Sequence, residues 1–125
     1  MLFLPAVRIQ REDWDRLMQL AFDARHNQHP AAPLLRSEVH RAIVTRDRAD
    51  EVVQLNGAVR YRLDERAPVD QVLVHPDDHG TIELNLSVLT SLGAALIGIR
   101  VGDCMLFLCA DGTLHQVTPL GCKTV

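Results

Sequence analysis

Hydrophobic residues recur at helical spacing in the first third of the chain. One stripe falls at i, i+3, i+4 and i+7 and predicts an amphipathic helix over residues 11–25; its members are Trp14, Leu17, Met18 and Ala21. A second, shorter helix follows, with a stripe made of Leu35, Val39, Ala42 and Ile43. Residues 26–33 contain two prolines and interrupt the pattern. We expect the helices to form an antiparallel hairpin that projects from the molecule. The alternative is that both helices lie flat on a sheet.

From residue 59 onward the period of the pattern changes to two. Alternating or continuous apolar residues predict strands over 59–63, 69–75 and 82–88, with turns between them. Ser91 is suited to cap a short helix that runs to about Ile97, and Gly98 suits the position after its end. Two further strands, 104–109 and 113–118, flank Asp111-Gly112 and predict a hairpin.

These elements predict an α+β fold. A helical hairpin in residues 1–50 precedes a small domain, residues 51–125, that combines an antiparallel sheet with a short helix. The polar stretch 45–51 suits a linker between the two.

Composition narrows the functional classes. The 125 residues are 47% hydrophobic but only 4% aromatic, so the core is expected to be aliphatic. The net charge of −3 argues against a general nucleic-acid binder, and no apolar run approaches the ~20 residues of a membrane span. The first residues lack a basic leader. We therefore expect a cytoplasmic protein whose cysteines, Cys104, Cys109 and Cys122, are free thiols.

Histidines and cysteines offer only weak signals for a metal or catalytic site. His75 and His79 bracket two aspartates, but in a Pro/Gly turn, where solvated residues are the simpler interpretation. His26 and His29 flank a helix end, and for them too solvated loop residues are the simpler interpretation. Cys104 and Cys109 are five residues apart and point to opposite faces of one strand, which does not suit a shared zinc ion. A Cys–His nucleophile would need His115 from the neighbouring strand. We expect no metal, cofactor or catalytic group.

The glycine and arginine patterns give little further indication of a ligand or partner. Gly93, Gly98 and Gly102 do not have dinucleotide-binding spacing. Arg60 and Arg62 share one face of a strand; this is either a docking surface for an acidic partner or an ordinary solvated face.

The segment from Leu86 to Asp103 resembles the signature of the GreA/GreB C-terminal-domain family, and most closely its Rnk branch, the regulators of nucleoside diphosphate kinase. The most specific part is Gly-Ala-Ala-Leu-Ile-Gly at 93–98 followed by Val-Gly-Asp at 101–103. Further matches occur in the same order, at residues 37–42, 52–57, 59–62 and 72–76. The resemblance implies an FKBP-like sheet domain that carries a short antiparallel coiled coil.

The resemblance also implies a partner, bacterial RNA polymerase, bound at its secondary channel. The loop that touches the polymerase in the Gre relatives matches Leu89, Thr90, Ser91, Leu92 and Gly93. The family usually has proline where this chain has Ser91. Gre factors place carboxylates at the coiled-coil tip to help hold Mg²⁺ for transcript cleavage. The matching tip here, Arg25, His26, Asn27, Gln28 and His29, has no carboxylate, and the helix before it spans only ~22 Å.

Three functional hypotheses follow. The first is a polymerase-binding regulator that lacks cleavage activity and competes with Gre factors, with DNA contact only through the transcription complex. The second is a peptidyl-prolyl isomerase, disfavoured because the second domain has only two aromatic residues, Tyr61 and Phe107. The third is a regulator of nucleoside diphosphate kinase, acting directly or through its expression. The oligomeric state and any redox role of the thiols are not predicted.

Overall fold

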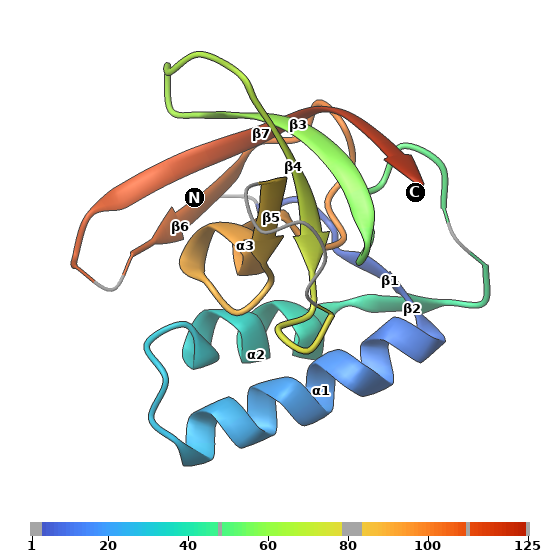
Figure 1. Cartoon of the computed structure of the whole chain (residues 1–125), viewed down its shortest axis with the longest axis vertical. Coiled ribbons are helices and arrows are strands. Elements are labelled where there is room, and N and C mark those ends of the chain that lie inside the picture. The colour runs from blue at the N-terminus through green and yellow to red at the C-terminus, as the bar shows by residue number, and fades with distance from the viewer. Residues whose placement is uncertain (1–3, 48, 79–83, 110, 125) are drawn as a thin grey trace.

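The computed structural model describes residues 4–47, 49–78, 84–109 and 111–124. It is a mixed helix and sheet structure in which a curled sheet covers a short helix, with a pair of longer helices below (Figure 1). No helix of these residues is long and apolar enough to cross a bilayer.

The two predicted N-terminal helices are confirmed. Helix α1 runs from Arg11 to His26 and α2 from Ala32 to Arg41. The indole Nε1 of Trp14 donates a hydrogen bond to the carbonyl oxygen of Val39 at 3.0 Å and ties the helices together. The apolar stripe of the second helix ends earlier than the periodicity predicts, since residues 43–45 form a strand and Ile43 is 52% exposed.

This early end reflects a small parallel sheet that sequence periodicity misses. Strands β1 (Arg8–Gln10) and β2 (Ile43–Thr45) pair in parallel, with Arg8 opposite Ile43. They bring the start of α1 and the end of α2 to one place, and so fix the base of the helical hairpin.

The main sheet has five strands in the order β5-β4-β3-β7-β6. Their bounds are Gly57–Leu63 for β3, Val69–Val74 for β4, Asn85–Ser87 for β5, Met105–Leu108 for β6 and Leu114–Thr124 for β7. The predicted β6–β7 hairpin is confirmed, with Leu108 opposite Leu114. The predicted strand over 82–88 is confirmed for 85–87, while residues 82 and 83 lie outside the described residues.

The prediction of a purely antiparallel sheet is wrong at one position. β5 runs parallel to β4, with Val72 opposite Asn85. A parallel neighbour needs a connection long enough to return the chain to the same end of the sheet, and residues 75–84 separate these two strands.

The prediction of a projecting hairpin is also wrong. Helix α2 lies between α1 and the body of the molecule (Figure 1), and α2 contacts the short helix α3, Ser91–Leu96. Leu17 of α1 and Leu35 of α2 are fully buried in the same core cluster as Leu73 of the sheet. Burying these stripes against the body removes apolar surface from water, which a free arm would leave exposed.

Candidate docking loop and helical tip

Residues 89–93, which we call the docking loop, are held in shape by hydrogen bonds among themselves and with Ser87. The Ser87 Oγ accepts a hydrogen bond from the Leu89 amide at 3.1 Å. The Thr90 hydroxyl donates to the Ser87 carbonyl oxygen at 2.7 Å and accepts from the Gly93 amide at 3.0 Å. The loop therefore needs no partner to order it.

Thr90, and not Ser91, is the N-cap of α3. Thr90 has extended backbone angles (φ −140°, ψ 161°), as an N-cap residue requires, whereas Ser91 is already helical. The prediction of a short capped helix is confirmed, but its cap lies one residue earlier. Gly98 follows the helix with φ +78°, consistent with its predicted place after the end.

Gly93 permits the tight packing of this loop. A β-carbon at position 93 would lie 2.1 Å from the carbonyl oxygen of Ser87 and 2.9 Å from the Cα of Val88. Both distances are far inside van der Waals contact. The first turn of α3 can approach the loop backbone only because residue 93 has no side chain.

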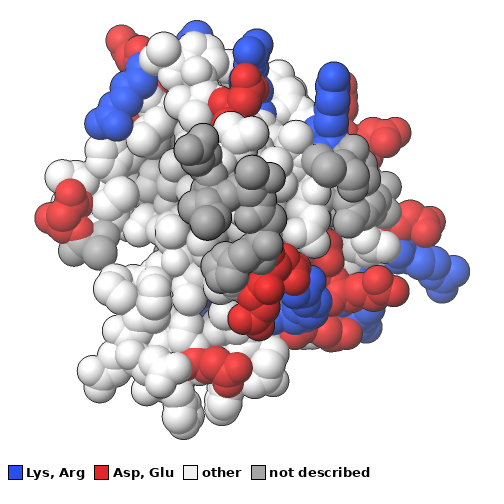
Figure 2. Space-filling view, viewed as in Figure 1, with Lys and Arg blue, Asp and Glu red and all other residues white. Residues whose placement is uncertain are grey.

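The outer surface of the docking loop is uncharged and partly exposed. Leu89, Thr90, Ser91 and Leu92 are each partly accessible, and the two leucines also pack against the core. In Figure 2 the lower left of the visible face, over α3, the start of α2 and the end of α1, is nearly free of Lys, Arg, Asp and Glu. Such a surface suits a partner that offers apolar and neutral polar groups.

The helical tip, residues 25–29, is closed by local hydrogen bonds. Asn27 is the C-cap of α1, and its amide donates to the Asp23 carbonyl oxygen at 3.1 Å. Gln28 takes the left-handed conformation with φ +56°. The His29 amide donates to the Ala24 carbonyl oxygen at 2.8 Å, and His29 Nδ1 accepts from the Ala31 amide at 3.1 Å. The His29 ring is therefore engaged within its own loop.

None of the five tip residues carries a carboxylate. Residues 25–28 are exposed, and the His26 ring lies 5.0 Å from the ring of Phe22, which is 58% exposed. The nearest acid is Asp23, whose Oδ1 accepts from Gln19 Nε2 at 3.0 Å one turn further back in α1. The tip offers cationic and neutral groups, which do not suit a hard cation such as Mg²⁺.

His26, His29 and His75 belong to no cluster of three or more metal-binding residues in the described part of the chain. His75 is buried, and its Nδ1 accepts from the Asp77 amide at 3.1 Å. His79 lies outside the described residues. Among residues 4–47, 49–78, 84–109 and 111–124 no group of three or more His, Cys, Asp or Glu could hold a metal ion.

The side chains of Cys104 and Cys122 have contacts other than His115. Cys104 Sγ lies 3.5 Å from Gln116 Oε1, whereas the His115 ring contacts Asp64 and Thr113. Cys122 donates to the Val52 carbonyl oxygen at 3.5 Å, and burial together with Glu51 raises the pKa of its thiol. A raised pKa makes a thiol less reactive.

The two arginines of β3 differ in their contacts. Arg60 forms a two-pronged ion pair with Asp70 on β4, at 3.0 and 3.1 Å, which also raises the pKa of its guanidinium. Arg62 is exposed. An acidic partner would have to displace Asp70 to reach Arg60.

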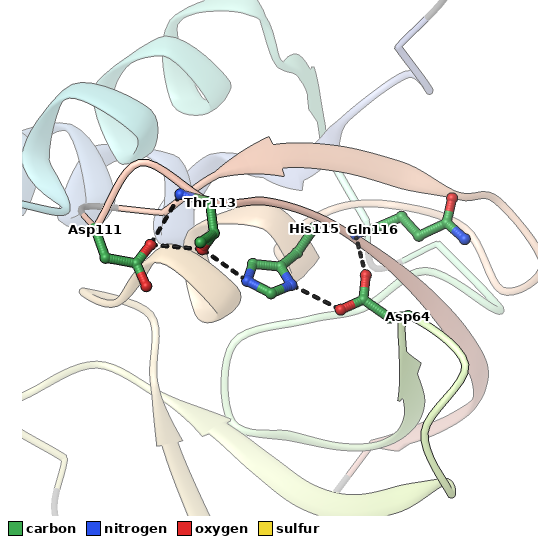
Figure 3. A network of polar contacts seen from close by, with 5 residues as sticks. All are labelled: Asp64, Asp111, Thr113, His115 and Gln116. Atoms are coloured by element: carbon green, nitrogen blue, oxygen red, sulfur yellow. Dashed lines mark hydrogen bonds and ion pairs between the residues drawn. The ribbon is translucent and has the colours of Figure 1, made fainter.

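Two polar clusters were not predicted from the sequence. Glu38 of α2 is buried and pairs with Arg41, whose Nη1 donates to the Pro5 carbonyl oxygen at 2.7 Å. The second cluster surrounds His115 (Figure 3). Its members are up to 52 residues apart, so short-range motifs could not reveal it.

Comparison with known proteins finds relatives both by sequence and by structure. No family profile matches the chain. The chain is 31% identical over 102 residues to the "Regulator of nucleoside diphosphate kinase" of Escherichia coli K12. The match covers 79% of this chain and 75% of that protein. The protein of the same name from Shigella flexneri gives the same identity and coverage. Its structure is similar to the "Prokaryotic transcription elongation factor GreA/GreB from Nitrosomonas europaea", with a TM-score of 0.72 and 28% identity over 95% of this chain and 99% of the other.

Proposed function

The chain belongs to the GreA/GreB C-terminal-domain family, in the branch of the regulators of nucleoside diphosphate kinase, and we propose from this membership that it binds bacterial RNA polymerase at the secondary channel without stimulating transcript cleavage. It would thereby act in the cytoplasm as a transcription regulator that competes with Gre factors. The FKBP-like relationship of its sheet stays a prediction, as does the boundary between residues 50 and 51.

The observation that carries the proposal is the preformed docking loop. The family resemblance matches residues 89–93 to the polymerase-contacting loop of the Gre relatives, and hydrogen bonds of the Thr90 and Ser87 side chains hold this loop in shape without a partner. A preordered loop loses little conformational entropy on binding. Its uncharged surface favours docking on an apolar element of the partner.

The absence of cleavage activity is inferred from the helical tip. The tip has no carboxylate to offer Mg²⁺, and Asp23 is held by Gln19. The helices also pack along the body instead of extending from it, which shortens their reach further. We infer that the protein occupies the polymerase without supplying a metal ligand.

A stalled elongation complex tests this directly. The RNA is assayed for cleavage with the protein alone, with GreA alone and with both. We expect no cleavage with the protein alone and slower GreA-dependent cleavage as its concentration rises. Faster trimming of the RNA by the protein alone would contradict the proposal, and so would unchanged GreA activity.

A matched pair of variants locates the contact. Ser91→Glu places a charge on the docking loop, whereas Ser37→Glu places the same charge on the exposed face of α2. We expect S91E to weaken competition with GreA at least tenfold and S37E to leave it unchanged. Equal effects of the two variants would exclude the loop as the contact.

The name of the curated relatives supports a second candidate, control of nucleoside diphosphate kinase. We favour an indirect effect through transcription of the kinase over direct contact. Deleting the gene should then change the amount of kinase, while purified kinase should not bind the protein. Binding with unchanged kinase amount would favour direct contact.

A further inference from the structure

Two turns that are distant in sequence are joined by a continuous chain of polar contacts (Figure 3). Asp64, in the turn after β3, lies with its Oδ2 2.6 Å from His115 Nδ1 on β7. The other ring nitrogen, Nε2, lies 2.9 Å from the hydroxyl of Thr113, which lies 2.5 Å from Asp111 Oδ1. The Asp111 oxygen also accepts the Thr113 amide at 3.0 Å. The imidazole is thus bracketed between two carboxylates.

The hydrogen-bond donors and acceptors in this network determine the protonation state of the His115 imidazole. An ionised carboxylate can only accept, so the Thr113 hydroxyl must donate its single proton to Asp111. The hydroxyl then has only lone pairs to offer His115, and Nε2 must carry a proton. Nδ1 must carry one as well, because it faces the Asp64 carboxylate. The arrangement in Figure 3 therefore corresponds to a doubly protonated imidazole.

The surroundings keep both carboxylates ionised. The Gln116 amide and the His115 ring lower the pKa of Asp64, and Arg66 acts in the same direction. The Thr113 hydroxyl and amide lower the pKa of Asp111. From β6 the ring is faced by Phe107, an uncharged side chain whose centroid lies 6.0 Å away. Within the described residues, Asp64, Arg66 and Asp111 are the charged groups that these contacts connect to the imidazole.

We propose that the Thr113 hydroxyl is a two-position switch set by the protonation of His115. With the ring doubly protonated, the hydroxyl donates to Asp111. With the ring singly protonated at Nδ1, Nε2 becomes an acceptor and competes for the same hydroxyl proton, so that Asp111 keeps only the Thr113 amide. Histidine is the side chain best suited to such a change near neutral pH.

Nuclear magnetic resonance of the ¹⁵N-labelled protein tests the proposal from about pH 5 to pH 9. We expect both ring nitrogens of His115 to be protonated at the acidic end, and Nε2 alone to lose its proton as the pH rises. The amides of Gly112 and Thr113 should shift with the same midpoint. A ring with one proton throughout, or one that loses the Nδ1 proton, would overturn the proposal.

Two substitutions separate the switch from a general effect of pH. Thr113→Val keeps the shape of the side chain but removes the hydroxyl, and the amide response at residues 112 and 113 should be lost while the ring still titrates. Thr113→Ser keeps the hydroxyl and should preserve the response. If T113V responds as the unmodified protein does, the hydroxyl is not the switch and the proposal fails.

Discussion

Gly93 and Ser87 approach so closely that a β-carbon on residue 93 would lie 2.1 Å from the Ser87 carbonyl oxygen. The obstructing atom is backbone and cannot rotate away. Gly93→Ala should therefore destabilise the protein by about 3 kcal/mol or more, as forced overpacking does. Urea unfolding measures the loss. Gly121→Ala is the control, since a β-carbon there meets no atom within 4 Å and the change should stay within about 0.5 kcal/mol. Equal stability of the two variants would contradict the close approach.

Ser91→Pro should stabilise the docking loop. Ser91 is the first residue of α3, where proline is favourable, and the extended backbone of Thr90 is what proline requires of the residue before it. We expect a gain of about 0.4–1 kcal/mol from the lower entropy of the unfolded chain, with tighter binding to polymerase. Thermal unfolding and a binding titration measure both. Ser91→Ala, which leaves backbone freedom unchanged, should give neither gain; a less stable S91P would show that the loop is not shaped for proline.

The helices, the β6–β7 hairpin and the short α3 were predictable because each has a local signature: a 3.6-residue or two-residue period, or a turn sequence. The strands β1 and β2 were not, since three residues are too few to show a period. The apolar stripe around Leu17 and Leu35 predicts that the helices bury a face, but not that they bury it against α3 and the sheet. For the candidate site, the residue types at the tip could be predicted from the sequence, whereas the contact between Asp64 and His115 depends on the register between β3 and β7.

Arg41→Met should cost much more stability than its position near the helix end suggests. Glu38 is buried with only 3% of its side chain exposed, and Arg41 is its ion-pair partner. Removing the guanidinium leaves a carboxylate buried without its cation and frees the Pro5 carbonyl oxygen, for a loss of about 2–4 kcal/mol. Arg36→Met, at an exposed position of the same helix, should change stability by at most about 0.5 kcal/mol. Similar chemical denaturation midpoints for both variants would count against a stabilising role of the pair.

Asp64 should make the protein sensitive to acid. Its pKa is lowered in the folded state by the Gln116 amide and His115, so its contribution to stability is present above the unfolded value of about 3.9 and is lost as the pH falls through the folded value. Asp64→Asn should lower stability at neutral pH and flatten its decline below about pH 4. Urea unfolding at several pH values measures the slope. Asp50→Asn, at an exposed carboxyl, is the control; a slope unchanged in D64N would contradict the prediction.

The missing carboxylates at the helical tip and the short reach of the packed helices are separate reasons for the expected absence of cleavage activity. The two reasons can be tested separately. The double substitution Asn27→Asp and Gln28→Asp supplies carboxylates at the tip without disturbing the fold, because aspartate tolerates the left-handed conformation of residue 28. If the missing charge were the sole obstacle, this variant would trim stalled RNA. We expect it not to, because both helices stay packed on the body through Leu17 and Leu35. The variant should still compete with GreA, which shows that it binds. Cleavage above the background rate would mean that the tip reaches the catalytic metal and that charge alone decides the activity.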